Sequence, residues 1–213
     1  MNKLQNIKFS WIVGMLGPVV LLAYLNFAFG WVDLSRRLAL VLAFAIGPAG
    51  MLGTLELTRR LPAQFNKEAV RVGATFLVVA FAILTLMLTM QQALFAKFQT
   101  LKLAAAPEDL SALKQTFSLA NQVQLGADVA FDIFYCIGLF IISKVLLSVS
   151  GFPRALGVYG IVSSVSLLAL NIWTFPIPPK DAGAVDLGPA TILWWVGLIV
   201  FDRRNAKRNA VVA

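Results

Sequence analysis

Six long apolar segments constrain the fold of this chain more than any other feature of its sequence. A transmembrane helix needs about 20 mostly apolar residues, because each residue rises about 1.5 Å and the hydrocarbon layer is about 30 Å thick. The chain has 213 residues, and 59% of them are hydrophobic, which is more than a soluble domain of this length needs for its core. The segments with the composition of membrane spans are 9–31, 38–57, 72–95, 123–147, 155–175 and 187–201.

These segments predict an all-α integral membrane protein with a six-transmembrane-helix bundle. The bundle is expected to be a single domain over the whole chain, 1–213, because no stretch between the spans is long enough for a second globular unit. None of the segments alternates strictly between apolar and polar residues, as a strand of a transmembrane barrel would. The first segment is longer than the apolar core of a signal peptide, so we expect it to be retained as a helix.

The distribution of basic residues predicts the orientation in the membrane. Twelve of the 18 Lys and Arg residues fall in the N-terminus, the second and fourth loops and the C-terminus, and six fall in the opposite set of loops. Cytoplasmic loops are enriched in Lys and Arg, so both termini are predicted to be cytoplasmic. With a formal net charge of +8, these cations are expected to meet anionic lipid headgroups. Nucleic acid is not an expected partner, because the basic footprint of a soluble nucleic-acid-binding module is missing.

Two of the predicted outer connections have a recognisable local structure. The longest connection, 96–118, is predicted to be an outer loop, in which Pro107 and the two acids after it favour the start of a short amphipathic helix. The last connection has three prolines within 176–179, which favour a stiff and extended backbone. Asp186 follows them and is predicted to cap the last helix or to lie in its first turn.

Two carboxylates lie inside the fourth span, where a charged group costs roughly 3 kcal/mol or more to insert. Asp128 and Asp132 are four residues apart, so both project from the same side of a helix. At about 100° per residue, the side chains of Asn121, Gln124 and Tyr135 fall on the same stripe. Ionisable residues inside a membrane usually face a protein interior or a watery cavity and usually serve function. The stripe therefore predicts a functional site on this helix.

Three other predicted spans carry polar side chains in the outer half of the bundle, namely Asn26, Gln91 and Asn171. If these helices face one another, they line an acidic site that opens outward. The alternative is that each polar group bonds a neighbouring helix and serves only to hold the bundle together. The predicted ligand-binding residues are Asp128, Asp132, Gln124, Asn121, Asn171, Tyr135, Asn26 and Gln91.

The near absence of nitrogen and sulfur ligands excludes several kinds of site. The chain has no histidine and a single cysteine, Cys136, so neither haem nor zinc is expected as a cofactor, and no catalytic pair with histidine can form. A divalent cation held by carboxylates stays open as an alternative. Cys136 lies within a predicted span, where we expect it to be a small buried apolar residue.

The second half of the chain resembles a broad bacterial family of six-helix membrane proteins that is classed only as a domain of unknown function. The resemblance lies in QLGADVAFD at 124–132, LNIWTFPIPP at 170–179 and DLGPATILWW at 186–195. The first half matches that family only in its hydropathy. The resemblance implies a bacterial inner-membrane location and the six-helix layout, but it implies no activity.

Acids without a cationic partner in the membrane suit a cationic or hydrogen-bonding ligand. The leading prediction is therefore a protein that binds or transports a cation, a polar or cationic small molecule or a lipid headgroup. One alternative is a membrane-embedded enzyme that acts on a lipid-linked substrate, with Asp128 and Asp132 as an acid/base pair or as metal ligands. No complete catalytic motif is present, so we expect binding rather than catalysis. The other alternative is a structural or regulatory partner of another membrane protein.

Overall fold

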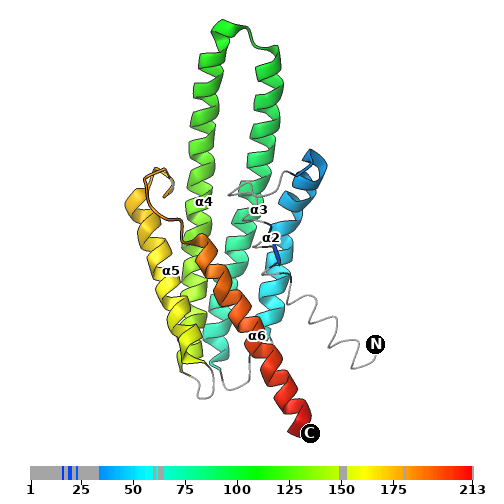
Figure 1. The fold of residues 1–213 in the computed structure, drawn as a ribbon, viewed down its shortest axis with the longest axis vertical. Helices are drawn as coiled ribbons and strands as arrows, with labels where there is room; N and C mark the ends of the chain where they lie inside the picture. The colour runs from blue at the N-terminus through cyan, green and yellow to red at the C-terminus, as the bar shows by residue number, and fades with distance from the viewer. Residues whose placement is uncertain are drawn as a thin grey trace.

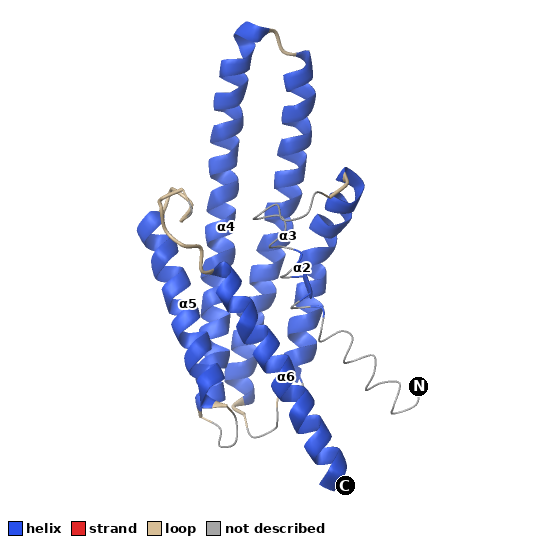
Figure 2. Cartoon of the chain, in the orientation of Figure 1, coloured by secondary structure: helices blue, strands red, loops and turns tan. Residues whose placement is uncertain are grey.

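The computed structural model of the chain describes residues 34–59, 61, 65–148, 153–179 and 181–212, with Leu16, Val19, Val20 and Ala23, and it describes side chains up to Phe201. Within these residues the chain is helical and contains no strand. The helices run alternately up and down, and α6 crosses the others obliquely (Figures 1 and 2). Their bounds are Arg36–Arg59 for α2, Lys67–Ala104 for α3, Leu110–Leu147 for α4, Arg154–Thr174 for α5 and Gly188–Val212 for α6, with the 3-10 turn η1 over Pro107–Asp109.

Four of the six predicted spans are helices that are long and apolar enough to cross a membrane. They are α2, α3, α4 together with η1, and α5. The apolar part of α6 is shorter and covers Gly188–Phe201. The predicted first span, 9–31, lies almost entirely outside the described residues. The all-helical, multi-span character expected from the sequence is confirmed to that extent.

The outward faces of these helices are apolar, as they must be if lipid surrounds them. Large aliphatic side chains are more than half exposed on three different helices, at Val41, Leu86 and Val162. A soluble protein seldom exposes many large apolar side chains together, because it would associate through them. The described helices therefore have the surface of a multi-pass membrane protein.

The third and fourth helices are longer than the sequence predicts. Each has 38 residues, so each is about 57 Å long at about 1.5 Å per residue. The segment 96–118, which was expected to be a loop, is helical except around 105–109. The helix expected to start at Pro107 does start there, but it runs through η1 directly into α4. Consequently α3 and α4 project as a hairpin beyond the ends of α2 and α5 (Figure 1).

Aromatic and small residues hold the two arms of this hairpin together. Near its tip the rings of Phe98 and Phe117 stack at a centroid distance of 4.2 Å. Near its base the backbones approach closely, since a Cβ atom on Gly138 would lie 2.8 Å from the carbonyl oxygen of Gly73. Between these points, Phe81 of α3 packs against two aromatic rings of α4. These contacts fix the antiparallel register of α3 and α4.

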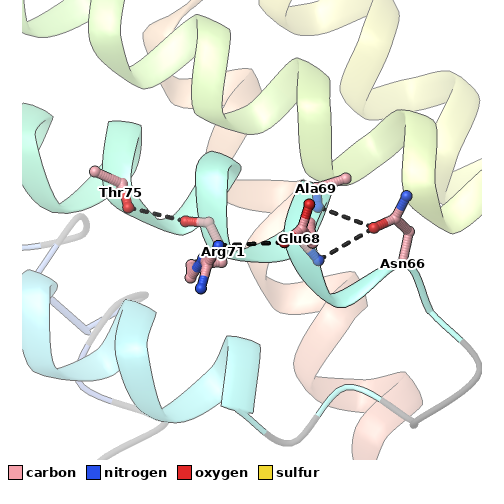
Figure 3. A network of polar contacts seen from close by, with 5 residues as sticks. All are labelled: Asn66, Glu68, Ala69, Arg71 and Thr75. Atoms are coloured by element: carbon pink, nitrogen blue, oxygen red, sulfur yellow. Dashed lines mark hydrogen bonds and ion pairs between the residues drawn. The ribbon is translucent and has the colours of Figure 1, made fainter.

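Local hydrogen bonds fix the start of α3 (Figure 3). The side-chain oxygen of Asn66 accepts hydrogen bonds from the backbone N–H groups of Glu68 and Ala69, at 3.1 and 3.2 Å. These N–H groups have no partner within the helix, which is why asparagine is favoured at this position. One turn on, Arg71 pairs with the Glu68 carboxylate at 3.4 Å, and the Thr75 hydroxyl donates to the carbonyl oxygen of Arg71. The connection from α2 therefore ends in a capped helix.

Small residues allow α5 to approach both α4 and α6. The missing side chain of Gly160 leaves room for the Ser143 hydroxyl of α4 and for the indole of Trp194, whose Nε1 would be 2.5 Å from a Cβ atom there. Gly157 lies against α4 in the same way, with the Ser143 carbonyl oxygen 2.9 Å from a Cβ position. Close approach through small residues is a principal source of stability for helices in lipid, where the hydrophobic effect between helices is absent.

We predict that Gly160→Ala destabilises the bundle, by about 1–3 kcal/mol, because the added methyl group overfills a packed contact between three helices. The matched control is Gly126→Ala in α4, where a Cβ atom meets nothing within 4 Å. That change should be neutral or stabilising by about 0.5–1 kcal/mol, since alanine is the better helix former. Unfolding of the purified variants in detergent measures both. Equal effects at the two glycines would contradict the packing assigned to Gly160.

Candidate functional site

A short polar contact between α4 and α5 joins two of the predicted site residues. The Asn171 side chain of α5 donates a hydrogen bond from Nδ2 to Oδ2 of Asp132 on α4, at 2.6 Å. Asn171 is buried, and Asp132 is partly buried. The amide therefore holds one carboxylate oxygen of Asp132 and leaves the other oxygen for a further partner.

This contact also sets the depth of the acids in the bundle. The helices α4 and α5 run in opposite directions, and Asn171 lies three residues before the last residue of α5, Thr174. The end of α5 is therefore close to the level of Asp128, one turn above Asp132. At about 1.5 Å per residue, Asp132 lies roughly 5 Å below the end of α5. The two aspartates sit at the hairpin end of the part of α4 that α5 covers.

A third carboxylate, which was not among the predicted site residues, lies near this pair. Asp132 is within electrostatic range of Asp186 as well as of Asp128. Asp186 precedes α6, and its Oδ1 accepts a hydrogen bond from the backbone N–H of Gly188 at 2.8 Å. The carboxylate thus holds the first N–H group of α6, but Asp186 lies two residues before the helix, neither at its N-cap nor in its first turn, where the sequence predicted it. The sequence places Asp186 near the start of the last helix. Nothing in the spacing along the chain relates it to Asp132, which lies 54 positions earlier.

A chain of hydrogen bonds ties α6 to α4 directly below the acids. The Trp195 indole donates from Nε1 to the Tyr135 hydroxyl at 2.8 Å, and this hydroxyl donates to Oγ1 of Thr191 at 3.1 Å. The Thr191 hydroxyl in turn donates a hydrogen bond to the carbonyl oxygen of Gly188 at 2.7 Å. Tyr135 is 2% exposed, so its hydroxyl makes its hydrogen bonds within the protein and not with solvent. In this structure Tyr135 holds α6 in place, whereas the sequence suggested contact with a ligand.

A second tyrosine anchors the same end of α6 to α5. The Tyr159 hydroxyl donates to the carbonyl oxygen of Ala190 at 2.6 Å. This carbonyl is in the first turn of α6. The sequence did not identify this group of contacts, which involves Thr191, Trp195 and Tyr159. A tyrosine, threonine or tryptophan within an apolar segment gives no indication of its partner.

The structure describes three more of the predicted site residues, Asn121, Gln124 and Gln91. Asn121 is exposed on the projecting part of α4, and Gln124 is partly buried one turn further on. Gln91 of α3 has its side-chain oxygen buried, without a hydrogen-bond partner among the described residues. Asn26 lies outside the described residues. The structure therefore brings Asp132 and Asn171 into contact, places Asp128 one turn away, and adds Asp186.

Within the described ranges, no group of three or more carboxylate, thiol or imidazole side chains is arranged to hold a metal ion. Cys136, one turn beyond Asp132, is buried as the sequence predicts.

Comparisons of the chain with known protein families, with curated proteins and with solved structures find no match. The likeness of its second half to a bacterial six-helix family stays a prediction. A function for this chain is therefore inferred from its own residues.

The two adjacent tryptophans of α6 give a matched test of the hydrogen-bond chain. Both are at most 1% exposed, but Trp195 donates to Tyr135, whereas the Trp194 indole N–H has no partner among the described residues. We predict that Trp195→Phe lowers the free energy of unfolding by about 1 kcal/mol more than Trp194→Phe, because only the former breaks a hydrogen bond. Detergent unfolding of the two variants checks the difference. A larger loss in Trp194→Phe would show that packing, and not the hydrogen bond, dominates.

Proposed function

We propose that this chain is a bacterial inner-membrane protein with six membrane-spanning helices that binds or transports a cation at an acidic site in its outer half. The ligand would be an inorganic cation, a polar or cationic small molecule or a lipid headgroup. The observation that carries the proposal is the Asp132 carboxylate, held by Asn171 at 2.6 Å and within electrostatic range of Asp128 and Asp186.

Electrostatics supports a cationic ligand. In an apolar environment two like charges repel far more strongly than in water, because the effective dielectric constant is lower. Three carboxylates near one another at a helix junction therefore favour the binding of positive charge. The Asn171 amide uses its donor to orient Asp132 and can offer its carbonyl oxygen to the same ligand. Asp128 and Asp132 would attract the ligand, and Asn171 would set its position.

The distribution of cations supports the proposed orientation. Basic side chains gather at one end of the described bundle, at the end of α2, the start of α3, the end of α4 and the start of α5; they are Arg59, Lys67, Arg71, Lys144 and Arg154. The C-terminal end of α6 lies at the same end (Figure 1). Cytoplasmic faces carry such an excess, and anionic headgroups are the partners that it fits. With this end inside, the hairpin and the acids face outward.

Cysteine labelling tests the orientation. In a Cys136→Ser background, we expect Leu103→Cys, which is 89% exposed near the hairpin tip, to react with a membrane-impermeant maleimide added to spheroplasts. Lys67→Cys, at the start of α3, should react only after the membrane is made permeable. Both side chains lie outside the apolar core, so both thiols can ionise and react once the reagent reaches them. The reverse pattern would place the hairpin in the cytoplasm.

The thermal stability of the purified protein tests which ligand it binds. Purified protein would be heated with a panel of monovalent and divalent cations, organic amines and lipid headgroups. A ligand present at 100 times its Kd should stabilise the wild type by about 2.7 kcal/mol. We expect this shift to disappear in Asp132→Asn and to weaken in Asp128→Asn, because each change removes a negative charge from the site.

The matched control is Asp109→Asn, which removes an exposed acid at the hairpin tip and should leave the shift intact. A shift that survives in Asp132→Asn would contradict the proposed site. Stabilisation by divalent metals alone, together with turnover of a lipid-linked substrate, would favour the enzyme over the transporter. A stable complex with another membrane protein and no ligand shift would favour the structural or regulatory role.

A further inference from the structure

The sixth helix begins well inside the bundle. Its contacts with α5 pair Gly160 with Trp194 and Leu156 with Gly197, and the two helices run in opposite directions. Counting back from Trp194 to the first residue of α6, Gly188, puts that residue opposite about residue 166 of α5. The remaining eight residues of α5 extend about 12 Å beyond it. Figure 1 shows the same step, with α6 starting below the upper end of α5.

The segment before α6 must therefore descend into the bundle without being helical. It leaves α5 after Thr174 and reaches α6 at Gly188, and its last four residues, 184–187, form no helix or turn. They pass the level of Asp132, which lies opposite Asn171 near the end of α5. The electrostatic effect of Asp186 on Asp132 agrees with this path.

The backbone N–H groups of this segment have few partners among the described residues. The N–H of Ala184 donates to the carbonyl oxygen of Pro179 at 2.8 Å, and that of Gly188 donates to Asp186. Between them, no backbone N–H of residues 185–187 donates a hydrogen bond within the described part of the chain. Val185 is 77% exposed, and Asp186 and Leu187 after it are partly buried. An unpaired N–H group that faces hydrocarbon would cost several kcal/mol.

We propose that residues 184–187 line a water-filled path from the outer face of the membrane down to Asp132. Non-helical backbone at membrane depth is tolerated only where protein buries it or where it lines a watery cavity, and the exposure of Val185 favours the cavity. Water would take the hydrogen bonds of the free N–H groups. Short helices that start within the membrane are found beside substrate sites in transporters for the same reason. The inference rests on the proposed membrane embedding, and it supplies the route to the proposed site.

The start of α6 forms the lower end of this path, and several hydrogen bonds hold it in place. The chain from Trp195 through Tyr135 to Thr191, with the bond from Tyr159 to Ala190, holds the first two turns of α6 against α4 and α5. These bonds keep Asp186 at the depth of Asp132. Buried aromatic side chains therefore close the lower end of the path. The carboxylates of Asp132 and Asp186 lie at this closed end.

Two valines at similar depth provide the test. Val185 and Val165 are both exposed, at 77% and 52%, but Val165 lies on α5 with its backbone inside the helix. In a Cys136→Ser background, each is changed to cysteine and treated with a membrane-impermeant methanethiosulfonate from the outer side. A thiol reacts as its thiolate, which forms in water and not in hydrocarbon, so Val185→Cys should react at least about tenfold faster than Val165→Cys.

Equal and slow reaction at both positions would overturn the path, because residue 185 would then face lipid or protein. Equal and fast reaction would overturn the depth assigned to the segment. If Val185→Cys does not fold, the pair Ala184→Cys and Ala169→Cys gives the same comparison on smaller side chains. The reaction needs no ligand, so an open path with no cation binding would refute the proposed function and leave this inference standing.

Discussion

The close antiparallel contact between α3 and α4 is the interaction on which the rest of this structure depends. In lipid the hydrophobic effect does not drive helices together, so stability must come from packing and from hydrogen bonds between helices. Here the Gly73 and Gly138 backbones approach closely, and Phe81 packs against Phe131 and Tyr135 above them. The contact fixes the rotation of α4 about its axis, and this rotation decides which helices its polar stripe can meet.

The acidic site and the core share one stretch of α4. Tyr135 packs in the aromatic cluster with Phe81 and, at its hydroxyl, holds Trp195 and Thr191 of α6. Asp132 lies one turn before it and is held by Asn171 of α5. A single stretch of about one turn therefore joins four helices. Any change that loosens this junction alters the bundle and the acids together, which is why matched pairs of substitutions are needed to separate the two effects.

The sequence predicts the helices that lie within the apolar segments, because lipid imposes a length and a composition that can be read directly. It does not predict the hairpin, since a hydropathy pattern stops at the first polar residues although the helix continues through Lys97 and Lys102 to Ala104. The polar stripe predicts Asp128 and Asp132, and Asn171 proves to be a partner of the latter. Asp186 and Thr191 could not be assigned, because their neighbours are set by the depth at which α6 begins and not by spacing along the chain.

The length of α4 has a mechanical consequence. It runs without a proline or a break from Leu110 beside the hairpin tip, past both aspartates, to Leu147 at the basic end. A helix of this kind bends only slightly, so a force applied to the projecting arm is carried to the other end as a rotation or a small axial shift. A contact made on the projecting hairpin can thus change the separation between Asp132 and the start of α6 without touching either of them.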